Sequence, residues 1–285
     1  MNKVGIVGLG LIGGSMAIDL RRRGFANEII GVESDQVNQE GALRLGLVNR
    51  TISYRECIEE ADILVLAVPV GTAVRMLPEI LDIYVEEGDR GRIVIDVCST
   101  KRALAERVAG HPLRSRYVAT HPMAGTEYSG PWAAMPNLFD GKACIIADPS
   151  LSDPSAVSAV EALYDALHMR VTSMDSASHD VHTAYVSHIS HITSFALALT
   201  VLDKERDEKH IFDLASGGFS STVRLAKSSP DMWVPILAQN RENILQVMDT
   251  YIGKMQAFRE AIATGDEARI RTMIEEANHI RKILG

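Results

Sequence analysis

The sequence predicts an α/β fold in which a Rossmann-type, doubly wound sheet is followed by an all-helical second domain. From residue 4 to about 171, short β-rich segments alternate with amphipathic helical segments, as in parallel sheets with crossover helices. A glycine-rich turn follows the first of these segments. After Met174 the β-rich segments stop and helical patterns continue. We therefore expect a dinucleotide-binding domain at 1–172 and a helical substrate-binding and dimerisation domain at 173–285.

Seven segments of the first half have the composition of strands. Most are apolar throughout, which is expected of strands that helices cover on both faces. They lie at 4–7, 28–32, 63–67, 93–96, 117–120, 143–147 and 171–172.

The second half is predicted to be helical. In a helix from about 175 to 202, one face carries four residues at i, i+4, i+7 and i+11 spacing, namely Ala184, His188, His191 and Phe195. Further helices are expected within 206–216, 219–228, 230–263 and 266–283. A helical segment of this size beside a Rossmann-type domain often packs against its own copy, so we expect a homodimer.

Composition excludes several classes of function. The 285 residues carry a formal net charge of −8, which argues against binding to nucleic acid or to anionic membranes. No secretory signal and no apolar run of roughly 18 residues is evident, so a cytoplasmic protein is expected. Cys57, Cys98 and Cys144 are widely spaced and odd in number, as expected of reduced packing thiols.

The glycine-rich turn Gly8-Leu9-Gly10-Leu11-Ile12-Gly13 predicts a dinucleotide site. It lies between a strand and a helix, the context that the G-x-G-x-x-G pattern requires. Gly8 permits the turn, Gly10 lets the backbone approach a pyrophosphate, and Gly13 lets the helix pack closely on the strand. Leu11 and Ile12 open the helix, whose free N–H groups face the anion. The alternative is a Rossmann-like scaffold or sensor without redox chemistry.

Glu33 ends the second predicted strand, about 20 residues beyond Gly13, where a carboxylate can bind an adenosine ribose. A 2′-phosphate would be repelled there, and Ser34-Asp35-Gln36 offers no arginine to offset the repulsion. NAD is therefore preferred over NADP as cofactor. The alternative is a solvated carboxylate at the strand end.

Other candidate residues follow the carboxyl ends of predicted parallel strands, where ligands of open α/β sheets bind. Val68 and Pro69 follow one strand, Ser99 the next, and His121 a third. Near neutral pH a histidine can accept the proton of an alcohol while a nicotinamide takes the hydride. Ser99 could orient that imidazole or bind the substrate hydroxyl. The alternatives are a structural His121 and a Ser99 that caps a helix from 101 to 109.

These motifs resemble those of the prephenate and arogenate dehydrogenases of tyrosine biosynthesis. The ordered set covers nearly the whole chain, and it is far more specific than any single motif. It consists of Gly8 to Gly13, Asp96-Val97-Cys98-Ser99-Thr100-Lys101, His121 to Glu127, His179-Asp180, Ser187-His188-Ile189-Ser190-His191, and Arg224 in Ser221-Thr222-Val223-Arg224-Leu225-Ala226.

The resemblance implies an NAD-dependent oxidative decarboxylation of a cyclohexadienyl substrate. By the family's pattern His121 accepts the hydrogen bond of the substrate hydroxyl, with Ser99 as its partner, and Arg224 pairs with a substrate carboxylate. The pocket would be lined by Thr126, Glu127, His179, His188 and His191. Prephenate is the expected substrate, with arogenate as the alternative.

Simple chemistry agrees in part. Prephenate is a dianion, and an arginine can bind a carboxylate through two hydrogen bonds. Without the resemblance, Arg224 could equally form a surface ion pair, and His188 and His191 could be interior histidines whose hydrogen bonds are all made within the protein. The two histidines have no evident third ligand, so no metal site is expected.

The chain departs from the family at Ser221, where relatives commonly have aspartate, and at Ser190, where they often have proline. The first departure leaves the orientation of Arg224 and the substrate side-chain preference open. A β-hydroxyacid dehydrogenase is a weaker alternative, because 175–202 lacks that family's helix lysine. A nucleotide-sensing or dimerisation module is the non-enzymatic alternative. Little chain follows the last predicted helix, so we expect no appended regulatory domain.

Overall fold

The computed structural model describes residues 2–208 and 210–284. Contacts divide the chain into two compact units, Met1–Asn240 and Arg241–Gly285. The domain boundary expected at 172/173 stays a prediction.

The first unit is built on a sheet of eight strands among the described residues. In sheet order these are β3 (Arg50–Thr51), β2 (Ala26–Val32), β1 (Asn2–Val7), β4 (Ile63–Leu66), β5 (Ile93–Asp96), β6 (Tyr117–Pro122), β7 (Ala143–Ala147) and β8 (Arg170–Met174). The order reverses between β1 and β4, which defines the switch point of a doubly wound fold. Strands β3 to β6 are parallel, whereas β7 runs antiparallel to β6 and β8 parallel to β7.

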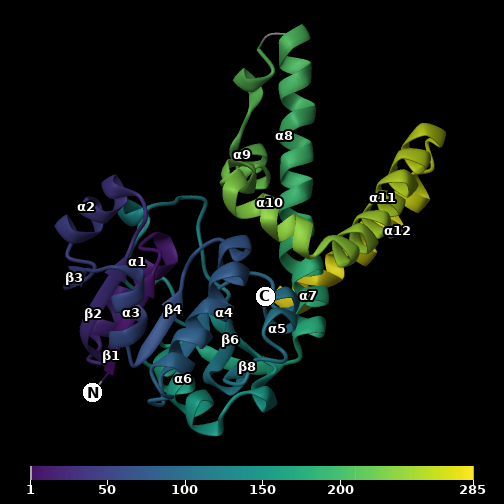
Figure 1. Cartoon of the computed structure of the whole chain (residues 1–285). Helices are drawn as coiled ribbons and strands as arrows, with labels where there is room; N and C mark the ends of the chain where they lie inside the picture. Colours follow the sequence, from purple (N-terminus) through teal and green to yellow (C-terminus); the bar gives the residue numbers. More distant parts are fainter. Residues whose placement is uncertain (1, 209, 285) are drawn as a thin grey trace. The chain divides into compact units, whose positions relative to one another are not determined.

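Helices cover both faces of this sheet (Figure 1). They are α1 (Leu11–Arg22), α2 (Gln36–Arg44), α3 (Tyr54–Glu60), α4 (Val70–Glu86), α5 (Arg102–Arg107) and α6 (Pro154–Ala166), with short 3₁₀ turns at Arg114–Arg116, Pro131–Ala133 and Pro149–Leu151. Side-chain oxygens of Asp35, Ser53 and Asp153 cap the starts of α2, α3 and α6.

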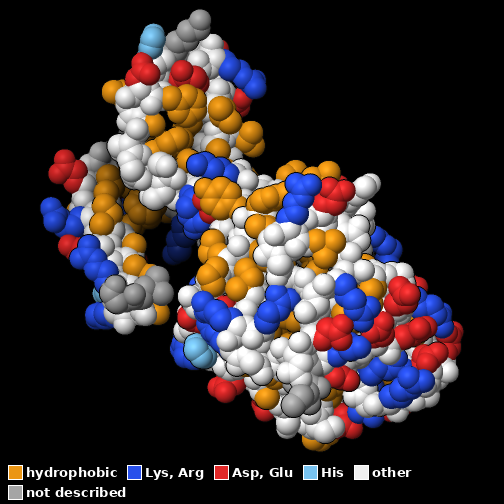
Figure 2. Space-filling model, turned by 90° about the vertical axis from the view of Figure 1, so that its left-hand side faces the viewer, with side chains coloured by type: hydrophobic (Ala, Val, Ile, Leu, Met, Phe, Trp, Pro, Cys, Tyr) orange, Lys and Arg blue, Asp and Glu red, His pale blue; other side chains and the backbone are white. Residues whose placement is uncertain are grey.

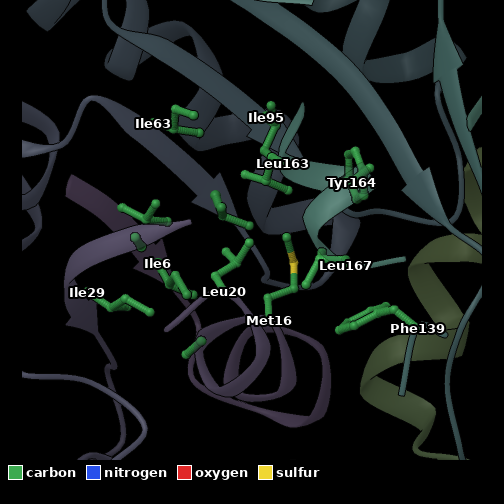
Figure 3. Packing of buried hydrophobic residues seen from close by; sticks show 14 of the residues in the cluster. Ile6, Met16, Leu20, Ile29, Ile63, Ile95, Phe139, Leu163, Tyr164 and Leu167 are labelled. Carbon is green, nitrogen blue, oxygen red and sulfur yellow. The ribbon is translucent and has the colours of Figure 1, made fainter. Parts of the chain in front are cut away.

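Two apolar cores lie against the two faces of the sheet. On one face, alternate strand residues such as Ile6 and Ile95 pack with α1 and α6, as Figure 3 shows around Met16, Leu20 and Leu163. On the other face, the intervening strand residues pack with α3, α4, α5 and Trp233. Because side chains alternate along a strand, a nearly continuous apolar strand serves both cores.

The helical remainder of the first unit contains α7 (Ser176–Thr183), a π-helical turn (Ala184–His188), α8 (Ile189–Asp207), α9 (Gly217–Thr222) and α10 (Pro230–Gln239), with 3₁₀ turns at Phe212–Leu214 and Arg224–Lys227. The predicted helical face is confirmed for His188, His191 and Phe195, which all contact the Trp233 ring. The second unit contains α11 (Arg241–Thr264), α12 (Glu267–Ala277), a 3₁₀ turn (Asn278–Ile280) and α13 (Arg281–Leu284).

The Rossmann-type fold with a helical second half is confirmed, and the differences are local. Strand β7 was predicted to be parallel to its neighbours but runs antiparallel to β6. The connection at 123–142 contains no crossover helix, which a parallel arrangement of β6 and β7 would require. Strand β3 was not predicted, since its two residues are too short to show periodicity. A helix within 206–216 is wrong for most of that range: α8 ends at Asp207 and only Phe212–Leu214 forms a turn, while residue 209 lies outside the described residues.

Candidate functional site

A cavity of about 540 Å³ opens at the carboxyl ends of β1, β4, β5 and β6. It runs from the glycine-rich turn past His121 to α10. The predicted site residues that line it are Gly10, Leu11, Ile12, Val68, Pro69, Ser99, His121, Thr126, Glu127, His191 and Arg224. The structure thus brings together residues predicted separately for a dinucleotide and for a substrate.

The glycines of the turn differ in what surrounds them. Gly8 has φ +96°, and a Cβ there would lie 2.3 Å from the Ala67 carbonyl oxygen. A Cβ at Gly13 would lie 2.1 Å from the Gly8 carbonyl oxygen. A Cβ at Gly10 would meet only Gly130 N, at 3.9 Å, and would project into the cavity. Gly8 and Gly13 are therefore needed by the fold, whereas Gly10 keeps open the space before the N-terminus of α1.

Glu33 lies at the end of β2, outside the cavity lining. Its carboxylate accepts hydrogen bonds from Leu9 N at 3.1 Å and from Asp35 N at 3.1 Å. The carboxylate is thereby fixed beside the glycine-rich turn and stays partly exposed. From this position the carboxylate can accept hydrogen bonds from the hydroxyl groups of a ribose.

The connection from β6 to β7 forms the opposite wall of the cavity. Met135 N donates to Ser15 Oγ at 3.0 Å, and Asn137 N donates to Asp19 Oδ2 at 2.9 Å, so this connection is tied to α1. Its earlier part carries Thr126 and Glu127, which line the same cavity. One chain segment therefore borders both the dinucleotide side and the substrate side.

Ser99 follows β5, and its side chain is partly exposed to the cavity. Its hydroxyl forms no hydrogen bond with another described residue. The alternative of Ser99 as a helix cap is wrong: α5 begins at Arg102, and the Asp180 carboxylate accepts from Lys101 N at 2.8 Å and Arg102 N at 3.0 Å. The Ser99 hydroxyl is therefore available to a ligand.

His121 is the penultimate residue of β6 and is part of a buried chain of hydrogen bonds. Its Nδ1 is 2.8 Å from His179 Nε2, and His179 Nδ1 is 2.8 Å from Asp180 Oδ1. Since a carboxylate only accepts, His179 Nδ1 donates, and in neutral His179 the Nε2 atom accepts the Nδ1 proton of His121. The remaining nitrogen of His121, Nε2, then carries a lone pair.

The electrostatic surroundings keep His121 neutral. Burial first, and then the neighbouring His179, Lys101 and His188, lower the pKa of His121 well below its ordinary value of 6.5. A neutral imidazole with a free Nε2 lone pair is the form that can accept a proton.

A buried ionic cluster supports the end of β6. Lys101 Nζ forms an ion pair with Asp96 and donates to the Thr120 carbonyl oxygen at 2.7 Å, and both charged side chains are fully buried. Tyr117 Oη donates to Asp96 Oδ1 at 2.7 Å. The residue directly before His121 is thus fixed by a charge-assisted hydrogen bond.

Arg224 extends from the 3₁₀ turn after α9 and donates to Glu127 Oε2 at 2.9 Å. The Arg224 side chain is 51% exposed, whereas that of Glu127 is 14% exposed. Ser221, where the family commonly has aspartate, instead donates to the Gly218 carbonyl oxygen within α9. Glu127 therefore provides the carboxylate partner that the sequence left open.

His191 and His188 take different positions. His191 lines the cavity, stacks on Trp233 with ring centroids 3.6 Å apart, and donates from Nδ1 to the Ser187 carbonyl oxygen at 3.1 Å. His188 is fully buried behind the cavity wall, where its Nδ1 is 3.1 Å from Asn240 Nδ2. His179 also lies behind the wall rather than in it. The two buried histidines thus contact protein groups, where the resemblance implied direct pocket lining.

Sequence reasoning left three buried residues out of the site, namely Lys101, Asp180 and Asn240. Lys101 and Asp180 belonged to the matched motifs, so a signal existed. Asn240 had none, because it falls inside a segment predicted only as helical and its partners lie 52 and 60 residues away.

The chain is similar to known proteins over its whole length. The nucleotide-binding domain family of prephenate dehydrogenase matches residues 16–173, and the prephenate dehydrogenase dimerization domain family matches 175–276. Prephenate dehydrogenase of Bacillus subtilis is 31% identical over 279 residues, covering 97% of this chain and 74% of the relative.

Two solved structures are similar in fold and sequence. Prephenate dehydrogenase of A. aeolicus, in complex with hydroxyphenyl propionate and NAD⁺, is 28% identical with a TM-score of 0.86, covering 100% of this chain and 99% of that one. Synechocystis arogenate dehydrogenase is 26% identical with a TM-score of 0.76, covering 99% and 100%.

Proposed function

Because the chain belongs to the prephenate dehydrogenase family, we propose that it uses NAD to convert prephenate to 4-hydroxyphenylpyruvate by oxidative decarboxylation. One observation carries the proposal. His121 lies in the same cavity as the glycine-rich turn and is hydrogen-bonded so that Nε2 can accept a proton.

The residues of the first unit suit NAD as the cofactor. The open space at Gly10, before the N-terminus of α1, suits a pyrophosphate, and the Glu33 carboxylate suits the two ribose hydroxyls of NAD better than a 2′-phosphate. Val68 and Pro69 would contact the dinucleotide from the β4 side. The domain boundary that we propose at 172/173 is supported by the two family matches, which meet between 173 and 175.

When bound, NAD would take a hydride from the carbinol carbon, while the ring carboxylate leaves as carbon dioxide and its bonding electron pair makes the ring aromatic. His121 Nε2 accepts the hydroxyl proton as the carbon–oxygen bond gains double-bond character. The proton returns to the phenolate oxygen after aromatisation, so the step releases no net proton. Ser99 Oγ, on the neighbouring strand end, would hydrogen-bond the same substrate oxygen.

The chain from His121 to Asp180 has a definite part in this step. As positive charge develops on the His121 ring, its Nδ1–H stays with His121 and its hydrogen bond to His179 Nε2 becomes stronger, while the Asp180 carboxylate accepts from His179 Nδ1. This arrangement stabilises the imidazolium and fixes the ring orientation, as the buried carboxylate does in hydrolase triads.

Arg224 would bind a carboxylate of the substrate side chain, in a cavity that Thr126 and His191 also line. An arginine forms bidentate, charge-assisted hydrogen bonds with a carboxylate. Glu127 already occupies one Arg224 nitrogen and would share or release it.

Arogenate is the second candidate substrate. It carries an ammonium group where prephenate has a keto group, and two carboxylates line the cavity, namely Glu127, which pairs with Arg224, and Asp231. Opposite charges within a few ångströms favour each other, so these carboxylates would suit an ammonium group.

We also propose a homodimer formed through the helical half. Exposed apolar side chains on α7, the π turn and α8 support it, namely Val181, Tyr185, Leu199 and Leu202. Figure 2 shows hydrophobic side chains gathered in places on this face of the molecule. Exposed patches of this kind are typical of association surfaces.

The same helices have a further property. By length and composition alone, Ser176–Asp207 could cross a membrane, although no apolar run of roughly 18 residues was expected in the sequence. The stretch also carries buried polar residues of the site, His179 and Asp180. Packing against a second chain would account for its apolar composition, and the free, buried cysteines suit a reducing cytoplasm.

The test is a set of steady-state assays with four substrate pairs: prephenate or arogenate, each with NAD or NADP. We expect the highest kcat/KM with prephenate and NAD. A higher kcat/KM with arogenate would make arogenate the substrate in place of prephenate, and a preference for NADP would contradict the proposed role of Glu33. Failure to form NADH or NADPH with either substrate would overturn the proposed function.

A further inference from the structure

Asn240 follows the last residue of α10 and is almost completely buried, at 3% exposure. Its Nδ2 atom is 2.7 Å from the Asp180 carbonyl oxygen and 3.1 Å from His188 Nδ1. It does not line the cavity. Any effect of Asn240 on the reaction must therefore pass through other residues.

The contacts determine the orientation of the amide. A carbonyl oxygen can only accept, so the Asn240 atom beside Asp180 must be the NH₂ group, which donates. An NH₂ group has no lone pair to offer, so His188 Nδ1 must accept the second hydrogen. Both amide hydrogens are used, and the single proton of neutral His188 lies on Nε2.

This tautomer keeps His188 uncharged. A proton on His188 Nδ1 would face the Asn240 NH₂ group and break the hydrogen bond. The titratable groups near His188 are Asp180 and His179 on α7 and His191 on α8, and His188 in turn acts electrostatically on His121. A cation at His188 would oppose the positive charge that His121 acquires when it accepts the substrate proton.

The other hydrogen bond of the Asn240 amide, to the Asp180 carbonyl oxygen, fixes the backbone of Asp180. The carboxylate of Asp180 binds His179 Nδ1, and it also accepts from the backbone at the start of α5, close after Ser99. The neighbour of Asn240 adds a further connection, since Gln239 Oε1 accepts from Thr100 Oγ1 at 3.0 Å. The end of α10 therefore contacts the supports of both His121 and Ser99.

We propose that Asn240 is a positioning residue for the proton acceptor: it fixes Asp180 behind His179 and holds His188 in its neutral Nε2–H form. This role rests on the proposed function of His121. It differs from a merely structural role because it predicts a defined tautomer and a defined change in the pH profile.

Two variants test the role. Asn240→Ala removes both donors, and we expect kcat to fall roughly 10- to 100-fold while KM for NAD is unchanged, because small misplacements of reacting groups cost about that much. Asn240→Asp keeps the shape but cannot donate, and its carboxylate attracts a proton to His188. Because a protonated His188 opposes the positive charge that His121 acquires, activity in this variant should be lost as the pH falls through the raised pKa of His188, so we expect the acid limb of the kcat–pH profile to move to higher pH.

The matched control is Asn49→Ala. Asn49 also hydrogen-bonds the backbone, but as an acceptor, since Ile29 N donates to its Oδ1 at 2.9 Å; it directly precedes the edge strand β3 and does not line the cavity. This control should lower the melting temperature and leave the pH profile unchanged. Wild-type kcat in Asn240→Ala, or an unshifted acid limb in Asn240→Asp, would overturn the proposal.

The unmutated protein provides an independent measurement that needs no variant to fold and no substrate. Histidine side-chain ¹⁵N spectra distinguish the two neutral tautomers and the cation. We expect His188 to be neutral with its proton on Nε2 at pH 7. A proton on Nδ1 would overturn the proposal even if prephenate is turned over, whereas the expected tautomer would stand even if prephenate is not the substrate.

Discussion

Arg224 and Glu127, 97 residues apart in sequence, form an ion pair with a 2.9 Å hydrogen bond on the wall of the cavity. The Glu127 carboxylate thus pairs with Arg224, the residue that we propose binds a carboxylate of the substrate. In the protein without substrate, the Arg224 charge is therefore partly compensated, and a substrate carboxylate has to compete with Glu127 for it.

Replacing Glu127 with glutamine should strengthen binding of a dianionic substrate. The change removes a negative charge near the substrate carboxylate and frees Arg224, so KM for prephenate should fall by a factor of roughly 3 to 10. Steady-state kinetics at low salt measure it. Asp231→Asn is the matched control, because Asp231 lines the cavity but makes no ion pair with another described residue. Equal effects of the two variants would mean that freeing Arg224 contributes nothing.

Replacing His121 with asparagine should lower kcat by roughly 10²- to 10⁴-fold, with little change in either KM, since it removes the proton acceptor. The wild-type rate should be lost as the pH falls through the lowered pKa of His121, because the imidazolium form cannot accept. A variant with near-normal kcat would exclude His121 from this role.

Two glycine substitutions should separate cofactor binding from folding. Gly10→Ala adds a methyl group to open space, so the melting temperature should stay near that of the wild type while NADH affinity falls roughly 10-fold or more. Gly13→Ala places a methyl group 2.1 Å from the Gly8 carbonyl oxygen, so the protein itself should be destabilised. Fluorescence titration and thermal unfolding check both, and undiminished affinity in Gly10→Ala would argue against a pyrophosphate at this turn.

Stability should decrease as the pH falls below about 6.5. Burial lowers the pKa of His188 to about 4, so the folded protein binds fewer protons than the unfolded chain between these values. The stabilisation is present above the unfolded-state pKa and is lost as the pH falls toward the folded-state pKa. The loss is on the order of 3 kcal/mol for this residue.

Urea unfolding at pH 7 and pH 4.5 measures that loss. Because carboxylates also titrate at low pH, the comparison is with His188→Gln, which cannot gain a proton. The wild type should lose more stability between the two pH values than the variant does. Equal losses would show that His188 does not titrate abnormally.

Local patterns predicted most of the fold. The strands at 93–96 and 143–147 have the predicted bounds, because their apolar composition ends sharply at a polar residue or a turn. The reversal at β7 was missed, since strand direction depends on the path of the connection and not on the strand's own residues. The π turn before α8 was missed for a similar reason, because the residue spacing alone is compatible with a regular helix.

The candidate site was predictable in its positions and less so in its pairings. Parallel strand ends meet at one edge, which places Ser99 and His121 together with the glycine-rich turn. The pairs His121–His179 and Asn240–His188 join residues 58 and 52 apart across different elements, and no periodicity encodes such contacts. Burial decides them: a polar atom that loses water must find a partner.

The β6–β7 connection has a thermodynamic consequence. It is anchored to α1 through Ser15 and Asp19, passes Gly10 at Gly130, and carries Thr126 and Glu127 into the cavity. If a dinucleotide at the turn shifts this segment and changes the affinity for substrate, linkage requires the substrate to change the dinucleotide affinity by the same factor. The two ligands of this cavity would then bind as a coupled pair.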